Sequence, residues 1–142
     1  MQLECFLETS AHQRPEKVAL VCDGSRWTFA QLESAANRLS HGLIAQGVQR
    51  GDRVALYLEN GWEAVVGVFG ILKAGAVFMT VNPTTKADKL RFILNNSRAS
   101  ALIAPARKLP ALESLWNETP HLRHVIATEA DAREVSIAGK HC

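Results

Sequence analysis

The sequence has little cysteine. Its 142 residues include three cysteines, Cys5, Cys22 and Cys142, and they form no C-x-x-C pair. Cys5 falls on the apolar face of an expected helix and Cys22 ends an expected strand, so we interpret both as small core residues rather than reactive thiols. The N-terminus, MQLECFLETS, lacks the basic start and apolar stretch of a secretion signal. This favours a cytoplasmic location.

Neither sign of charge predominates in the sequence. The 16 basic residues are mixed with 14 acidic ones, the formal net charge is +2, and no run of like charge occurs. The sequence therefore predicts no nucleic-acid partner. With 47% hydrophobic and 21% charged residues, it has the composition of one folded globular domain.

Glycine-rich nucleotide loops are absent. In GILKAGAVFMTVNP, residues 70–83, Gly70 and Gly75 have the spacing of a phosphate-binding loop. That loop places Lys and Ser or Thr after its second glycine, whereas here Ala76 and Val77 follow and Lys73 precedes it. The chain also has no G-x-G-x-x-G and no G-x-S-x-G, which excludes the dinucleotide fingerprint and the hydrolase nucleophile elbow.

The longest apolar run, residues 64–81, contains a single charge, Lys73. Its length matches a membrane span. A lysine at the middle of a span costs about 2.5 to 3.5 kcal/mol on insertion scales. Gly75, followed by β-branched Val77 and Thr80, instead predicts the end of a helix and then a buried strand. We therefore predict no span, and expect a side chain to be tolerated worse at Gly75 than at Gly67 within the helix.

Hydrophobic periodicity predicts alternating helices and strands. A first helix over 3–11 places Leu3, Phe6, Leu7 and Ala11 on one face, and Asp23-Gly24 predicts a hairpin turn. The expected strands are 18–22, 26–28, 53–58, 76–81, 99–104 and 124–127. Four other helices are expected. One begins at a Thr28–Gln31 capping box and ends at Gly47, and a second covers 61–74. A third begins at a Thr85 cap, and a fourth covers 109–116.

These elements predict an α/β fold with a mostly parallel sheet and helices on both faces, built from βαβ units. The expected domain covers residues 1–127, and residues 128–142, where the periodicity disappears, are expected to be a disordered tail. The sheet would then end at 124–127 with an uncovered edge. We therefore also expect exposed apolar surface and self-association.

Candidate metal ligands are limited to one cluster. His121 and His124 lie three residues apart, with His141 and Cys142 further along. His121 and His124 straddle an expected strand start and point to different faces, so no metal site is predicted. His12 and His41 fall on expected helix surfaces as solvated side chains.

The segment Asn82-Pro83-Thr84-Thr85 follows the expected end of a parallel strand, where ligands of such sheets collect. It supplies no nucleophile, base or metal ligand, so a plain helix start is favoured. No catalytic, cofactor-binding or metal-binding residue is therefore predicted in this chain.

Four stretches in order, WTFAQL, GDRVALYLEN, LKAGAVFMTVNP and KLRFILNNSRASALI, closely resemble the N-terminal part of AMP-forming acyl-CoA synthetases. That superfamily of adenylating enzymes includes luciferases and the adenylation domains of peptide synthetases. The resemblance covers roughly residues 10 to 127. It implies an incomplete N-terminal subdomain of an adenylate-forming enzyme, truncated before the ATP-binding phosphate loop.

The resemblance implies a two-step reaction that uses ATP, magnesium and CoA. A carboxylate attacks ATP to give acyl-AMP, and CoA then displaces AMP. Asn82-Pro83 resembles the acyl-CoA ligase form, which implies a fatty or related carboxylic acid as substrate. The family's phosphate loop, its Thr-Gly-Asp and its catalytic lysine have no counterpart here, so we expect this chain alone to be inactive and to need the remainder of the ligase.

Two alternatives remain open. The chain would otherwise be a stand-alone α/β binding or regulatory module without catalysis, or a fragment of an amino-acid adenylation domain.

Overall fold

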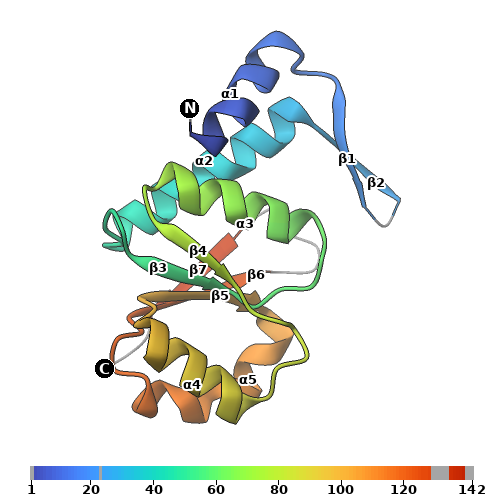
Figure 1. Ribbon diagram of the computed structural model, residues 1–142. Helices are drawn as coiled ribbons and strands as arrows, with labels where there is room; N and C mark the ends of the chain where they lie inside the picture. Colours follow the sequence, from blue (N-terminus) through green and yellow to red (C-terminus); the bar gives the residue numbers. More distant parts are fainter. Residues whose placement is uncertain (1, 23, 129–134, 140–142) are drawn as a thin grey trace.

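A sheet with a helical layer on each face makes up most of the molecule (Figure 1). The computed structural model describes residues 2–22, 24–128 and 135–139. Helices α1 (Leu3–Gln13), α2 (Phe29–Ala45) and α3 (Trp62–Lys73) lie on one side, and α4 (Ala87–Ser97) and α5 (Leu109–Leu112) lie on the other. The 3-10 turns η1 (Ala106–Lys108) and η2 (Glu113–Glu118) flank α5. The predicted fold class is confirmed.

The main sheet has the strand order β4-β3-β5-β6-β7. Strands β4 (Val77–Thr80), β3 (Arg53–Leu56), β5 (Ala101–Pro105) and β6 (His124–Thr128) are parallel, whereas β7 (Val135–Gly139) is antiparallel to β6. The chain enters at β3, in the interior of the sheet, adds β4 on one side and then crosses to β5 on the other. The crossovers are α3 and α4, as βαβ units require.

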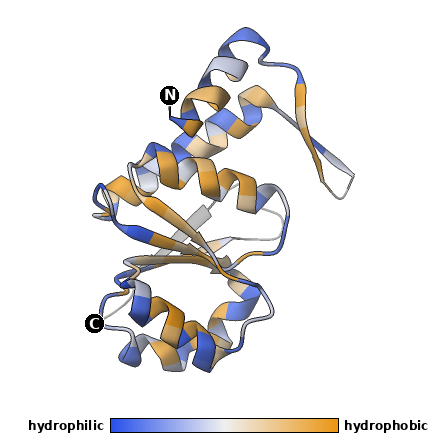
Figure 2. Cartoon of the chain, viewed as in Figure 1, coloured by the Kyte–Doolittle hydropathy of each residue, from blue (hydrophilic) through white to orange (hydrophobic). Residues whose placement is uncertain are grey.

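The apolar character of β3 and β5 follows from two separate cores. Val54 and Leu56 pack into the core shared with α2 and α3, whereas Ala55 and Tyr57 pack into the core shared with α4. Because successive side chains of a strand point to opposite faces, a strand covered on both faces must be apolar at every position. Figure 2 shows these strands as mainly hydrophobic, between helices of mixed character.

A hairpin outside the main sheet joins α1 to α2. Strands β1 (Val18–Cys22) and β2 (Ser25–Thr28) are antiparallel, and Gly24 takes a positive φ of 80° in the turn. The predicted hairpin is thus confirmed. The buried Trp27 of β2 stacks on Trp62 at the start of α3, with 4.7 Å between ring centroids, and so attaches the hairpin to the helical layer.

The predicted signals at both ends of α2 are confirmed. Thr28 Oγ1 accepts from the Gln31 amide at 3.1 Å, and the Thr28 amide donates to Gln31 Oε1 at 2.9 Å, which completes the capping box. Gly47 follows the end of the helix with φ 100°. A few neighbouring residues carry each signal, so no tertiary contact is needed to recognise it.

The stretch 70–83 is structural. Gly75 has φ 77° after the last turn of α3, and β4 follows, as predicted. Gly70 faces α2, where an added Cβ would lie 2.6 to 2.9 Å from three side-chain atoms of Leu39. Gly67 also lacks room, because its Cβ would lie 2.7 Å from Leu56 Cδ2. These glycines allow close packing rather than phosphate binding.

The expectation that residues 76–81 form a buried strand was wrong in part. Strand β4 lies at the sheet edge, with Val77 49% exposed, while Ala76 and Val81 beside it are buried. A run of apolar residues does not show whether a strand lies at an edge. None of the described helices is long and apolar enough to cross a membrane.

Four other expectations differ from the structure. On α1 only Leu7 is buried, and Leu3 and Phe6 are 50% and 57% exposed, because the neighbouring helices cover a narrow stripe of it. Cys5 and Cys22 are partly rather than fully buried. The N-cap of α4 is Lys86 instead of Thr85, without a side-chain cap. The helix expected at 109–116 is divided into α5 and η2.

The expected disordered tail, 128–142, includes strand β7. Thr128 ends β6, and the pairing of Thr128 with Val135 through His124 with Gly139 extends the sheet beyond the expected last strand. The pairing depends on the backbone of β6, and the short sequence pattern of residues 135–139 gave too little signal.

Candidate functional site

The carboxyl ends of three adjacent strands lie together at one end of the main sheet. We call this end the carboxyl edge, as distinct from the lateral edge that β4 forms. Tyr57 follows β3, residues 82–85 follow β4, and Lys108 lies just after β5. We call residues 82–85 the edge segment. Ligands of open parallel sheets bind outside such strand ends, so this edge is the candidate site on grounds of topology.

Internal hydrogen bonds give the edge segment a turn conformation. Asn82 Oδ1 accepts from the Thr84 amide at 2.9 Å and from the Thr84 hydroxyl at 2.8 Å. The Thr85 amide donates to the Asn82 carbonyl at 2.9 Å. The asparagine side chain thus imitates a backbone turn, and the observed role of the segment is structural.

Two side chains from neighbouring strand ends hold the edge segment. The Tyr57 hydroxyl donates to the Thr85 carbonyl, and Lys108 Nζ donates to the Pro83 carbonyl at 2.6 Å. Lys108 Nζ also lies 4.5 Å from the centroid of the Tyr57 ring. Burial raises the pKa of Tyr57 above 10.0, so its hydroxyl remains a donor at neutral pH.

Sequence reasoning missed Tyr57 and Lys108. The residue pattern assigns Tyr57 only to an apolar strand, and it gives Lys108 no role. The signal that could have found them is positional, because residues just after parallel strands meet at one edge. Nearby, Arg107 and Glu59 form an exposed ion pair at 3.4 Å.

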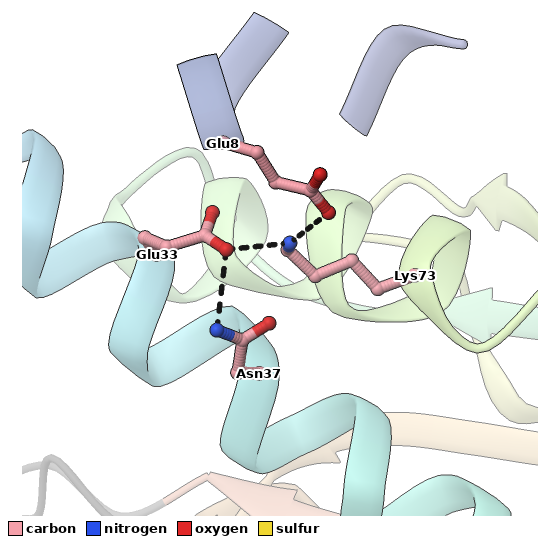
Figure 3. Close-up of polar contacts among 4 residues, drawn as sticks. All are labelled: Glu8, Glu33, Asn37 and Lys73. Carbon is pink, nitrogen blue, oxygen red and sulfur yellow. Dashed lines mark hydrogen bonds and ion pairs between the residues drawn. The ribbon is translucent and has the colours of Figure 1, made fainter. Parts of the chain in front are cut away.

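A second polar cluster joins the three helices of the opposite layer (Figure 3). Lys73 Nζ of α3 lies 2.7 Å from Glu33 Oε1 of α2 and 2.8 Å from Glu8 Oε1 of α1. Asn37 Nδ2 donates to the same Glu33 oxygen at 3.1 Å. The lysine that interrupts the longest apolar run therefore has two carboxylate partners from distant parts of the sequence.

The three charged side chains of this cluster differ in how far they are exposed to solvent. The side chain of Lys73 is 6% exposed, that of Glu33 is 18% exposed and that of Glu8 is 52% exposed. Burial alone would lower the pKa of Lys73, but hydrogen bonds and attraction from Glu33 and Glu8 outweigh it and raise the pKa above 10.5. The lysine is therefore charged at neutral pH and serves to join helices.

A shallow groove of about 440 Å³ runs beside this cluster. Its lining comes from α1 and α2 and comprises Glu8, Ala11, His12, Ala30, Glu33, Ser34 and Asn37. Glu33 Oε2 is buried without a hydrogen-bond partner. One oxygen of each carboxylate, Glu8 Oε1 and Glu33 Oε1, lies against Lys73.

The four described histidines do not assemble into a metal centre. His121 is exposed, and His124 is partly buried as the first residue of β6. His12 and His41 are exposed, as predicted, while His141 and Cys142 lie outside the described residues. Across residues 2–22, 24–128 and 135–139, no group of three or more His, Cys, Asp or Glu side chains could hold a metal ion.

A family model and curated proteins both match this sequence. The sequence model of the family described as AMP-binding enzyme matches residues 7–141. A medium/long-chain-fatty-acid–CoA/3-oxocholest-4-en-26-oate–CoA ligase of Mycobacterium tuberculosis is 41% identical over 115 residues, which are 81% of this chain and 21% of the relative. A plipastatin synthase of Bacillus subtilis is 38% identical over 98 residues, which are 69% of this chain and 4% of the relative.

Solved structures show the same relationship. The anthranilate CoA ligase AuaEII, solved with anthranoyl-AMP, has a TM-score of 0.84 and 31% identity over 90% of this chain and 25% of that one. The N-terminal domain of FACL13 from Mycobacterium tuberculosis has a TM-score of 0.82 and 29% identity over 92% of this chain and 34% of that one. The chain spans about a fifth of the length of the curated fatty-acid–CoA ligase that it matches.

Proposed function

Because the chain belongs to the family of AMP-binding enzymes, we propose that it forms the N-terminal scaffold of an ATP-dependent acyl-CoA ligase. The complete enzyme activates a carboxylic acid as acyl-AMP and then transfers the acyl group to CoA. The observation that carries the proposal is a single fold, a parallel sheet covered on both faces, whose sequence and backbone both match acyl-CoA ligases.

Among the described residues, the stretch 70–77 does not fit a phosphate-binding loop. The space at Gly70 is taken by Leu39, and Gly75 has positive φ at the end of a helix. Within the described ranges, no group of three or more His, Cys, Asp or Glu side chains could hold a metal ion. We therefore assign no chemical step to this chain. Its role is to supply a rigid sheet whose carboxyl edge faces the part of the enzyme that performs the reaction.

The proposed substrate is a fatty or related carboxylic acid. Asn82-Pro83 at the candidate edge resembles the acyl-CoA ligase form of the family motif, and the Mycobacterium tuberculosis relative is described as a fatty-acid–CoA ligase. An amino-acid adenylation domain is the alternative, supported by the match to the plipastatin synthase. The proposed location is the cytoplasm, where ATP and CoA are available.

The proposed partner is the remainder of the ligase. A chimera tests this directly. The aligned segment of this chain replaces the corresponding segment of the Mycobacterium tuberculosis ligase, and ATP–pyrophosphate exchange is measured with a fatty acid. We expect exchange from the chimera and none from the isolated 142-residue chain.

Two outcomes would contradict this function. A folded chimera that lacks exchange would favour a stand-alone binding module, and exchange dependent on an amino acid would favour the adenylation-domain alternative. Exchange by the isolated chain, purified away from any full-length ligase, would show a site that the geometry does not reveal.

We also propose that the isolated chain self-associates through β4. This strand is hydrogen-bonded on one side only, and Val77 is 49% exposed along it. Open edges with apolar side chains pair readily with other strands. Light scattering should detect oligomers that Val77→Lys reduces, whereas Val21→Lys, on the exposed hairpin, should not reduce them. A monomer at high concentration would contradict this proposal.

A further inference from the structure

Tyr57 and Lys108 contact both the edge segment and each other. Strand β3 lies between β4 and β5, so Tyr57, just after β3, stands between the edge segment and Lys108. One carbonyl of the segment, that of Pro83, accepts from Lys108, and another, that of Thr85, accepts from Tyr57. The two held carbonyls flank Thr84.

The contacts make the pair a single unit. The ammonium of Lys108 lies over the Tyr57 ring, an attraction that strengthens as water is excluded. Tyr57 is buried and Lys108 is partly buried. A charged donor to a carbonyl is stronger than a neutral one. Loss of either side chain would free one carbonyl and also remove the contact that orients the other.

We propose that Tyr57 and Lys108 are positioning residues, which fix the edge segment as one wall of the carboxylic acid site. This inference rests on the proposed ligase function. Neither residue contacts a reacting atom in the proposal. They act through the edge segment, whose conformation sets what the acid meets at the carboxyl edge of the sheet.

We call the contacts of Tyr57 and Lys108 with the edge segment the clamp. Amide hydrogen exchange in the 142-residue chain tests whether the clamp holds the segment. Thr84 and Thr85 donate their amides within the edge segment. In Lys108→Met and in Tyr57→Phe, we expect both amides to exchange on the order of tenfold faster, the effect of losing one favourable hydrogen bond. The Val81 amide, which donates to the Leu56 carbonyl in the sheet, should stay protected and so report an intact fold.

Arg107→Met is the matched control. It removes the same charge one residue away, from a side chain that pairs with the exposed Glu59. We expect it to leave the exchange of Thr84 and Thr85 unchanged. Lys108→Arg keeps a cation that donates and stacks, and it should restore most of the protection.

Kinetics of the ligase chimera test the positioning role. Lys108→Met should raise KM for the acid on the order of tenfold, since small misplacements of a site wall weaken productive binding, with KM for ATP unchanged and Arg107→Met without effect. Equal exchange rates in Lys108→Met and Arg107→Met would overturn the clamp. Faster exchange with an unchanged acid KM would overturn the positioning role. An inactive wild-type chimera would overturn the ligase function and this role with it, while the exchange data would still decide whether the clamp exists.

Discussion

Two lysines in two regions of the molecule show how surroundings decide what the same side chain does. Lys73 lies among three helices, 6% exposed, between the carboxylates of Glu8 and Glu33. Lys108 lies at the carboxyl edge of the sheet, partly exposed, against a carbonyl and an aromatic ring. The first neutralises charge inside a packed layer, whereas the second orders a segment next to solvent.

The difference follows from the demands of each environment. A buried ammonium needs opposite charge close by, because desolvation of an isolated charge is very costly. An ammonium at an edge keeps much of its hydration and can use a carbonyl and a ring as partners. Stability should therefore depend strongly on Lys73, and the conformation of the edge segment should depend on Lys108.

The largest expected effect comes from Lys73→Met. It leaves Glu33 without its cation in a mostly buried position, and breaking one side of a buried pair costs about 3 to 5 kcal/mol. Because Glu33 is 18% exposed, we expect the free energy of unfolding to fall by about 3 kcal/mol, the low end of that range. Urea denaturation measures it.

Two companion variants sharpen this comparison. Lys108→Met should cost only about 1 kcal/mol, the loss of one partly exposed hydrogen bond. In Lys73→Met combined with Glu33→Met, part of the lost stability should return, because no unpaired charge remains at that position. Equal losses for Lys73→Met and Lys108→Met would end the distinction between the two regions.

Gly70→Ala should be the next most damaging change. Its methyl group would meet three atoms of Leu39, including Cβ at 2.9 Å, and Cβ cannot move without the backbone of α2. Overpacking of this kind costs about 1 to 3 kcal/mol. At Gly67 the contact is with the end of the Leu56 side chain, so Gly67→Ala should cost less, although it should not gain stability as a helix propensity would suggest.

At Gly75 the strain has another origin. Its φ of 77° disfavours any side chain, so Gly75→Val should cost about 1 to 2 kcal/mol. This value lies between those expected for Gly70→Ala and Gly67→Ala. Urea midpoints of the three variants give the order, and a Gly67→Ala midpoint below that of Gly70→Ala would reverse the packing argument.

Alkaline pH should weaken the Lys73 cluster. The folded state raises the pKa of Lys73 above 10.5, so it binds the proton more tightly than the unfolded state does. Its contribution is fully present below pH 10.5 and is lost as the pH rises through the raised pKa. The stability gap between wild type and Lys73→Met should therefore narrow above about pH 10.5. Tyr57, whose pKa burial also raises, acts in the same direction in both proteins and so cancels from the gap.

The smallest expected effect concerns His124, at the amino end of β6. Burial, with help from the charge of Arg123 and against that of Asp52, lowers its pKa below 6.5. A lowered pKa stabilises the fold above pH 6.5, and that contribution is lost as the pH falls through the folded value. His124→Gln should therefore lose less stability than wild type between neutral and mildly acidic pH. Urea midpoints of wild type and His124→Gln that fall by the same amount over this pH range would contradict this prediction.

Local signals in the sequence predicted much of the fold. The capping box of Thr28 and Gln31 and the positive φ of Gly47 and Gly75 are all readable because a few neighbouring residues determine them. The parallel sheet was predictable too, since apolar strands alternate with helices. The exposure of Phe6 and Val77 was not, because it depends on which elements end up adjacent.

The candidate site was only partly predictable. The edge segment was placed at the end of a strand from sequence, but its partners Tyr57 and Lys108 lie 28 and 25 residues away from the carbonyls they bind. The Lys73 contacts with Glu33 and Glu8 cross 40 and 65 residues. Such pairs depend on strand order and helix packing, which a pattern of residue types along one chain does not specify.

The stack of Trp27 on Trp62 provides an optical reporter of one particular joint. Two indoles with centroids 4.7 Å apart and planes 21° apart couple electronically, so their near-ultraviolet circular dichroism depends on their mutual orientation. One indole belongs to the hairpin and the other to the first turn of α3. The part of the near-ultraviolet signal that arises from this pair, as distinct from Trp116, therefore follows the attachment of the hairpin to the helical layer. It does so separately from the far-ultraviolet signal of the helices themselves. A hairpin that detached before the sheet melted would be visible as the loss of the first signal while the second persisted.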